Sequence, residues 1–244
     1  MQTSENTILI TGGGTGIGLA LAEQFVELGN NVIICGRREN KLKKALQKLP
    51  GIRSLFCDLS NSDERRKLMD WTTSNYPGLN ILINNAGIQS YLNLKQPLNI
   101  DAIRQECEIN LIAPVHLSNL FFEQLNKQDN PAIINITSGL AFAPLAFMPV
   151  YCATKAALHS FSLSLRHQLS DTKIRVFEIA PPTVDTELDK GERSKRGLAD
   201  RGIKPEEFAI QAIDAIRKDI YEAAIGSANN LRLKREELFN IMNH

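Results

Sequence analysis

The chain has 244 residues, of which 43% are hydrophobic, and its 28 Lys and Arg nearly balance its 27 Asp and Glu. This balance gives no global attraction to nucleic acid or to an anionic membrane. The 15 Gly and 10 Pro are too few for a collagen or a low-complexity disordered chain. A chain of this length buries enough surface to fold without disulfides or metals. No linker separates two parts of the sequence, so we expect one domain over residues 1–244.

Other features of the sequence predict a cytoplasmic protein. The polar start of the chain lacks the basic and apolar regions of a signal peptide. The longest uncharged stretch, 133–154, contains two prolines and polar residues and predicts no membrane span. We expect no metal site, because the cysteines lack zinc-ligand spacing. We interpret all four as reduced core residues: Cys35, Cys57, Cys107 and Cys152.

Short β-branched runs alternate with amphipathic segments along the chain. Most of these runs are continuously apolar, which is typical of strands covered on both faces. The alternation predicts an α/β fold of the Rossmann type, a doubly wound parallel sheet of about seven strands with helices on both faces. The predicted strands are 7–10, 31–35, 52–56, 81–83, 132–137, 174–179 and 222–225.

Three of the connecting segments have distinctive patterns. Residues 17–28 place apolar side chains on one helical face, and Gly29 ends that helix. Residues 111–125 are apolar nearly all round, so a helix there should be buried on two sides. Residues 185–205 are charged and irregular, and we predict a mobile substrate loop there.

A glycine-rich string, Thr-Gly-Gly-Gly-Thr-Gly-Ile-Gly, spans 11–18 between the first predicted strand and helix. Glycine lets the backbone approach a pyrophosphate, and a helix N-terminus supplies free N–H donors. This context favours a dinucleotide site over a flexible turn, and the lack of a following Lys-Ser/Thr pair excludes a P-loop. The expected cofactor contacts here are Gly12, Gly14, Thr15, Gly16, Ile17 and Gly18.

The G-x-x-x-G-x-G spacing differs from the general G-x-G-x-x-G fingerprint and resembles the short-chain dehydrogenase/reductase family. The resemblance continues in the family's order through Asp58-Leu59, Asn84-Asn85-Ala86-Gly87, Asn110, Ser138, Tyr151-Cys152-Ala153-Thr154-Lys155 and 181–186. Within the family, residues 35–38, 182–186 and 239–243 resemble the bacterial DltE-like oxidoreductases. Pro182 stands where the family usually has Gly, which stiffens that turn.

The resemblance implies an oxidoreductase that moves hydride between a nicotinamide cofactor and a carbonyl or alcohol substrate. It implies that Ser138 holds the substrate oxygen, that Lys155 also binds the nicotinamide ribose, and that Asn110 anchors a water at the end of a proton relay. The further cofactor contacts that it implies are Asp58, Leu59, Asn85, Ala86, Gly87, Tyr151, Lys155, Pro181, Val184 and Thr186.

The end of the second strand indicates which nicotinamide cofactor is preferred. An acidic residue there would bind the ribose 2′-hydroxyl of NAD, whereas an Arg accommodates the 2′-phosphate of NADP. The chain has Gly36 at the acidic position, followed by Arg37 and Arg38, which predicts NADP(H). We interpret the lysines that follow as a solvated helix face: Lys41, Lys43, Lys44 and Lys48.

Tyr151 and Lys155 are four residues apart, so they share one face of a helix. A nearby Lys cation and an oxidised nicotinamide both favour phenolate and lower the pKa of the Tyr151 phenol. Such a phenol can protonate a carbonyl oxygen or deprotonate an alcohol. The histidines lack a nucleophile arrangement, so we expect core or surface roles for His116, His159 and His167.

The sequence leaves alternatives open for the function, for one apolar group and for the assembly. A non-catalytic NADP-binding sensor or scaffold would keep the glycine turn, and an S-adenosylmethionine methyltransferase would require an acidic residue where Gly36 stands.

Four uncharged residues after Ser138 either line a hydrophobic substrate pocket or pack under their own loop: Leu140, Phe142, Leu145 and Phe147. A stripe of small residues either pairs two copies in a homodimer or homotetramer or packs on the sheet: Ala153, Ala157, Ser160 and Ser164.

Overall fold

All seven predicted strands form, and they lie parallel in one sheet of the computed structural model, which describes residues 1–188 and 202–243. The spatial order is β3-β2-β1-β4-β5-β6-β7. The strands differ from their predicted bounds by one residue at most: β1 (Thr7–Thr11), β2 (Asn31–Gly36), β3 (Arg53–Phe56), β4 (Ile81–Asn84), β5 (Ala132–Ile136), β6 (Arg175–Ala180) and β7 (Glu222–Ala224).

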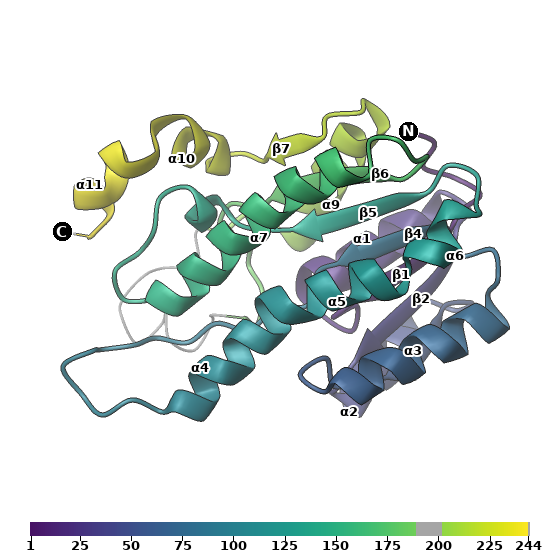
Figure 1. Cartoon of the computed structure of the whole chain (residues 1–244), viewed down its shortest axis with the longest axis horizontal. Coiled ribbons are helices and arrows are strands. Elements are labelled where there is room, and N and C mark those ends of the chain that lie inside the picture. Colours follow the sequence, from purple (N-terminus) through teal and green to yellow (C-terminus); the bar gives the residue numbers. More distant parts are fainter. Residues whose placement is uncertain (189–201, 244) are drawn as a thin grey trace.

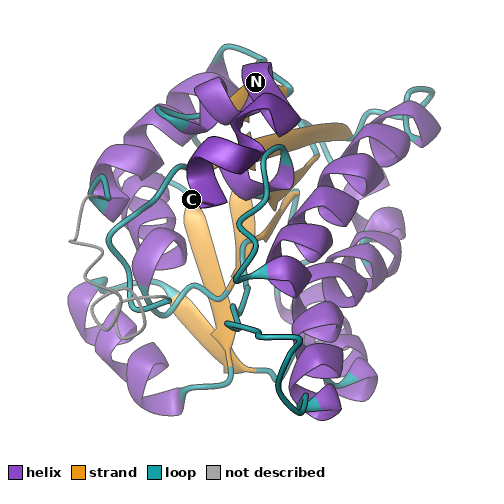
Figure 2. Ribbon diagram, turned by 90° about the vertical axis from the view of Figure 1, so that its left-hand side faces the viewer, coloured by secondary structure: helices purple, strands orange, loops and turns teal. Residues whose placement is uncertain are grey.

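Helices cover both faces of the sheet, as the alternating pattern predicts (Figures 1 and 2). One face carries α1 (Gly16–Glu27), α2 (Glu39–Lys48) and α9 (Pro205–Arg217). The other carries α3 (Ser62–Asn75), α5 (Ala113–Leu120), α6 (Phe122–Asn126) and α7 (Pro149–Gln168), with α4 (Ile100–Cys107) leading into α5. Two short helices end the chain, α10 (Ala228–Lys234) and α11 (Phe239–Asn243).

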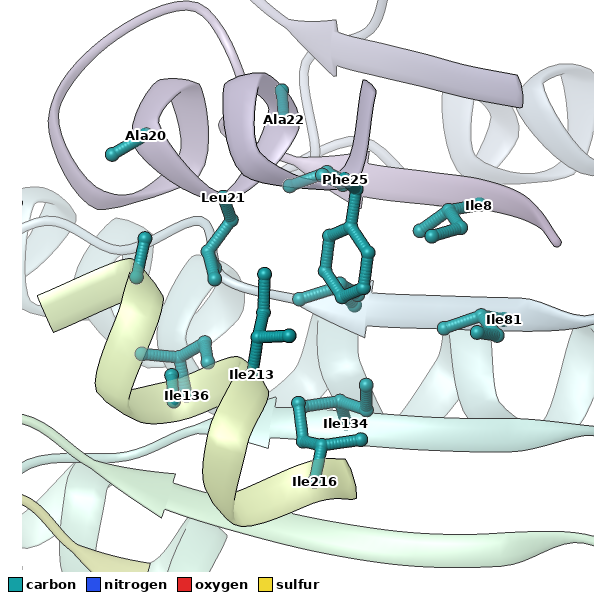
Figure 3. Packing of buried hydrophobic residues seen from close by; sticks show 14 of the residues in the cluster. Ile8, Ala20, Leu21, Ala22, Phe25, Ile81, Ile134, Ile136, Ile213 and Ile216 are labelled. Atoms are coloured by element: carbon teal, nitrogen blue, oxygen red, sulfur yellow. The ribbon is translucent and has the colours of Figure 1, made fainter. Parts of the chain in front are cut away.

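The larger core cluster lies between α1, α9 and the sheet (Figure 3). Phe25 of α1 and Ile213 of α9 pack over strand residues such as Ile8 and Ile134. Burying one such side chain stabilises the fold by about 1.5–3 kcal/mol. Because β1 has apolar side chains on both faces, Leu9 joins the second cluster on the opposite side.

The sheet has a topological switch point at β1, because the chain adds β2 and β3 on one side of it and β4 to β7 on the other. Parallel strands all end at the same edge, and a crevice forms outside that edge where the order reverses. The glycine string follows β1, and the Asn85-Ala86-Gly87 segment follows β4, its neighbour. The fold therefore brings these two motifs together.

The prediction for residues 111–125 is wrong in two respects. A π-helical turn, Glu108–Ile112, precedes α5, and the helix is interrupted at Phe121 before α6. Ile112 is 45% exposed and Val115 is 37% exposed, so the segment is not buried on two sides. The cause is its place in the outer layer, where only its inner face, with Leu117 and Phe121, meets the core.

Cys107 is only partly buried, whereas Cys35, Cys57 and Cys152 are buried, and all four are free. Of the predicted loop at 185–205, residues 189–201 lie outside the described residues. Within the part of the chain that the structure describes, no helix combines the length and apolar character needed to cross a bilayer.

Candidate active site

Close packing at the glycine turn explains its residue types. Gly12 has a φ of +66°, which favours glycine, and a Cβ there would lie 2.9 Å from the Ala86 Cα. A Cβ on Gly18 would lie 2.5 Å from the Gly12 carbonyl oxygen. The Thr11 hydroxyl accepts hydrogen bonds from the N–H groups of Asn85 (2.9 Å) and Ala86 (3.0 Å), so this side chain joins the two motifs.

A cavity of about 420 Å³ lies at this edge of the sheet. It runs from the start of α2 to Tyr151 and Lys155 on α7. Val184 is the one predicted cofactor contact outside its lining, and it packs against the core instead. The predicted contacts in the lining are Gly12, Gly14, Thr15, Gly16, Ile17, Gly18, Arg37, Arg38, Asp58, Leu59, Asn85, Ala86, Gly87, Tyr151, Lys155, Pro181 and Thr186.

The donor groups along this cavity suit a nicotinamide dinucleotide. Among the described residues, the N-cap residue Thr15 makes no side-chain hydrogen bond to the first turn of α1, which leaves the N–H groups of that turn available to a phosphate. Side chains on Gly12 and Gly18 would fill the space at this turn, so glycine keeps the backbone accessible. The far end of the cavity holds a buried amine and a phenol.

Lys155 is held in an unusual environment for a lysine. Its side chain is 3% exposed, and its Nζ donates a hydrogen bond to the Ile136 carbonyl oxygen at 2.9 Å. The same Nζ lies 5.8 Å from the centre of the Tyr151 ring. Burial lowers the pKa of Lys155 to about 8. The amine is therefore close to its titration point at neutral pH and near the phenol.

Asn110 lies on the π-helical turn and connects two elements of the site. Its Oδ1 accepts a hydrogen bond from the Ile88 N–H (2.9 Å), and its Nδ2 donates to the Ile88 carbonyl oxygen (2.8 Å) and to Thr154 (3.2 Å). A Cβ on Gly87 would lie 3.4 Å from the Asn110 Oδ1 and 3.6 Å from the Lys155 Nζ. The amide thus fixes the loop after β4 against α7.

Ser138 lies two residues beyond the end of β5 rather than on the strand. Its side chain is largely buried, and its hydroxyl accepts a hydrogen bond from the Leu140 N–H (3.1 Å) in the short helical turn Gly139–Ala141. A serine in this place keeps a hydroxyl at the carboxyl edge of the sheet, where Tyr151 also lies.

Residues 6–197 match the family model described as short chain dehydrogenase. The chain belongs to this family. It is 49% identical to the oxidoreductase DltE of Bacillus subtilis over 250 residues, covering 100% of this chain and 98% of DltE. The resemblance to DltE-like oxidoreductases is thereby confirmed.

Solved short-chain dehydrogenase structures share the fold. One from Burkholderia phymatum, in complex with NAD, superposes with a TM-score of 0.88 and 21% identity, covering 100% of this chain and 97% of that one. One from Burkholderia cenocepacia, in complex with NADP, has a TM-score of 0.83 and 24% identity, covering 96% and 94%. The Rossmann-type prediction is confirmed. The oxidoreductase class of the family applies to this chain.

A polar network next to Ser138 in this short-chain dehydrogenase was not predicted from the sequence. Thr137 donates a hydrogen bond to Glu178 (2.8 Å), and the other Glu178 oxygen pairs with the His159 Nδ1 (2.8 Å). The hydrogen bond that Glu178 accepts from the His159 ring raises the pKa of His159. The signal was present, since Glu178 is an acidic residue between the apolar Phe177 and Ile179 of a predicted strand.

The same network includes a group of side chains that could ligate a metal, although the sequence predicts no metal site. Donor atoms of His159, Glu178 and Glu222 lie within 4.8 Å of one another. These groups already have partners in the described part of the chain, because Glu178 pairs with His159 and Glu222 pairs with Arg232. Each carboxylate of the cluster thus has a nitrogen partner, and the sequence did not reveal the cluster because its members come from three separate elements.

Lys41 is a second residue that the sequence reasoning missed. It lines the cavity and pairs with Glu187, so its interpretation as part of a solvated helix face is wrong. The reason is that Lys41 lies in the first turn of α2, next to the end of β2, where it faces the cavity. By contrast, Lys43 and Lys48 pair with Glu39 and Glu23 away from it.

The uncharged residues after Ser138 have two different placements. Leu140, Leu145 and Phe147 are partly buried against the cluster that contains Tyr151. The Phe147 ring also stacks on Tyr91, with 5.4 Å between ring centres. Phe142 instead is buried, with its ring 4.9 Å from the His159 ring, so for this residue the packing interpretation holds.

Proposed function

We propose that this short-chain dehydrogenase is an NADP(H)-dependent oxidoreductase that interconverts a carbonyl and an alcohol. The observation that carries the proposal is the buried Lys155 amine, 5.8 Å from the Tyr151 ring centre, at one end of a cavity that begins at the glycine turn. When bound there, the nicotinamide supplies or accepts the hydride.

The protein's own contribution is the handling of one proton. Tyr151 donates its phenolic proton to the substrate oxygen during reduction and takes one back during oxidation. The Lys155 cation stabilises the phenolate form through space. Ser138 holds the substrate oxygen, and Asn110 keeps the loop after β4 in place for the relay that returns the proton to solvent.

The preference for NADP(H) rests on the cations at the other end of the cavity. Arg37, Arg38 and Lys41 line it, and Gly36 provides no carboxylate for a ribose hydroxyl. The related structures include both NAD and NADP complexes, so the preference depends on this chain's own residues. A paired guanidinium contact suits a phosphate better than a hydroxyl.

The cofactor proposal can be tested without knowing the substrate. NADPH and NADH would be titrated against the protein and against Arg37→Ala, with binding followed by nicotinamide fluorescence. We expect the substitution to weaken NADPH binding more than NADH binding, and equal losses would contradict the assignment. A panel of ketones, aldehydes and quinones, followed at the NADPH absorbance band, would then show which carbonyls are reduced.

The substrate proposed is a small carbonyl or alcohol compound with a hydrophobic part. The support is the apolar group beside Tyr151, which includes Leu140, Leu145 and Phe147. Turnover of such compounds in preference to charged ones is the expected result in the panel.

The proposed assembly is a homodimer or homotetramer that uses α5 and α7. Ile112 and Val115 near α5 and Leu163 on α7 are exposed hydrophobic side chains. The small-residue stripe on α7 also faces outward, since Ala153, Ser160 and Ser164 are exposed, which contradicts packing on the chain's own sheet. Sedimentation at micromolar concentration that shows only the 27.2 kDa monomer would reject the proposal.

A further inference from the structure

We call the end of the cavity lined by Arg37, Arg38 and Lys41 the adenosine end. Two of these cations, Arg38 and Lys41, are held by a carboxylate from the opposite side. Arg38 makes a 3.0 Å ion pair with Glu187 and donates a second hydrogen bond, 2.8 Å, to the Thr15 hydroxyl. Lys41 pairs with the other oxygen of Glu187. The hydrogen bond from Lys41 lowers the pKa of Glu187, so the carboxylate is ionised at neutral pH.

This ion pair joins two separate segments that both line the cavity. Arg38 and Lys41 follow β2, whereas Glu187 follows β6, and β1, β4 and β5 lie between these two strands in the sheet. Thr186, the residue before Glu187, lies over the glycine turn, where a Cβ on Gly16 would be 3.1 Å from its Cγ2. The bridge therefore connects the adenosine end to the segment after β6 that also lines the cavity.

A carboxylate and a phosphate compete for such a site. Both are anions that accept paired hydrogen bonds from a guanidinium, so one Arg–Lys pair serves either group. A phosphate monoester carries a charge of about −1.5 to −2 near pH 7, and this charge repels a neighbouring carboxylate. The 2′-phosphate of NADPH therefore meets Glu187 as a competitor, whereas NADH has no such group.

We propose that Glu187 is a cofactor-selecting residue, whose carboxylate occupies Arg38 and Lys41 until the 2′-phosphate of NADPH displaces it. The inference rests on the proposed NADP(H)-dependent function. Glu187 lowers the affinity for NADPH and leaves the affinity for NADH unchanged. When the phosphate of NADPH displaces the Glu187 carboxylate, the segment 186–188 loses its contact with Arg38 and Lys41. NADH binding leaves this contact in place.

The expected size of the effect follows from solvent exposure. The side chains of Arg38 and Glu187 are 52% and 50% exposed. Ion pairs of this kind are worth about 0.2–1 kcal/mol, which corresponds to a change of at most about five-fold in affinity. Salt should reduce it further, because the screening length falls from about 30 Å at 0.01 M to about 3 Å at 1 M.

The test compares the full chain with Glu187→Gln, using NADPH and NADH and, as competitors, 2′,5′-ADP and 5′-AMP. Glu39→Gln is the matched control. Glu39 is an exposed carboxylate on α2, the helix that carries Lys41, and it pairs with Lys43 outside the cavity lining. We expect Glu187→Gln to tighten NADPH and 2′,5′-ADP binding by about two- to five-fold at low salt. We expect no change for NADH or 5′-AMP, and none in the Glu39→Gln variant.

A double-variant experiment adds a second criterion. In an Arg38→Ala background, the effect of Glu187→Gln on NADPH should shrink, because part of the competition has been removed. Equal weakening of NADPH and NADH by Glu187→Gln would overturn the inference, since it would mean that the bridge holds bound cofactor. Unchanged NADPH affinity would also overturn it. If neither dinucleotide binds the unmodified protein, the proposed function fails, and the inference fails with it.

Discussion

Both ends of the cavity carry charged side chains, but these are buried at the catalytic end and exposed at the adenosine end. At the catalytic end, Lys155 is 3% exposed, and burial lowers its pKa to about 8. At the adenosine end, Arg38 and Glu187 are about half exposed and form a bridge that salt can screen. Burial makes the interaction between charges strong and sensitive to their positions, which suits proton transfer. Exposure to solvent makes the interaction weak, so that one anion can replace another, which suits selection between cofactors.

The largest effect is expected at the buried phenol. Tyr151→Phe removes the transferable proton while it keeps the ring that packs against Met148 and Cys152. Turnover should fall about 10²–10⁴-fold, the usual range for a general acid, and NADPH binding should survive. Steady-state rates on any substrate that the panel identifies would measure this. Near-normal turnover would show that the phenol has no such role.

A loss of stability is expected from the buried network behind Ser138. Glu178→Leu leaves the Thr137 hydroxyl and the His159 ring without their carboxylate partner. The free energy of unfolding should fall by about 2–3 kcal/mol, measured by urea denaturation. Glu222→Leu, which removes a partner of Arg232 that is 21% exposed, is the control and should cost less. A smaller loss for Glu178→Leu than for the control would mean that burial does not strengthen these contacts.

A pH-dependent effect is expected at Glu106, one turn before Asn110 on the same helical face. Its side chain is fully buried, and its Oε2 has no hydrogen-bond partner among the described residues. Burial raises the pKa of Glu106. Because the folded protein binds this proton more tightly than the unfolded chain, stability is lost as pH rises from the unfolded pKa through the folded one.

Glu106→Gln should therefore stabilise the protein by about 1 kcal/mol near pH 8 and by much less near pH 4. Urea denaturation of both proteins at the two pH values would measure the difference. A gain that does not depend on pH would show that the ionised carboxylate is not its cause.

The smallest effect is expected at the exposed bridge. Replacing Arg38 or Glu187 by Ala should change the free energy of unfolding by less than about 1 kcal/mol, since exposed ion pairs contribute little to stability. Thermal unfolding of each variant at low and high salt would measure this. A loss above 2 kcal/mol would remove the contrast between the two ends of the cavity.

The local features of the fold could be predicted from the sequence. The seven strands follow from short apolar runs, and α1 ends near Gly29, which has a φ of +79°. The i, i+4 spacing puts Tyr151 and Lys155 on one helix face, and the glycine string lies between β1 and α1. These features depend on residues that are near one another in the chain, so periodicity and glycine placement are enough to specify them.

Only the tertiary structure decided which distant residues become partners and how deeply they are buried. Glu178 meets His159 across 19 residues of sequence, and Glu187 meets Lys41 across 146. The exposed side of α5 likewise depends on the layer in which that helix lies. Partner choice and burial come from the packing of whole elements, and a side chain's pKa and the strength of its ion pairs depend on both.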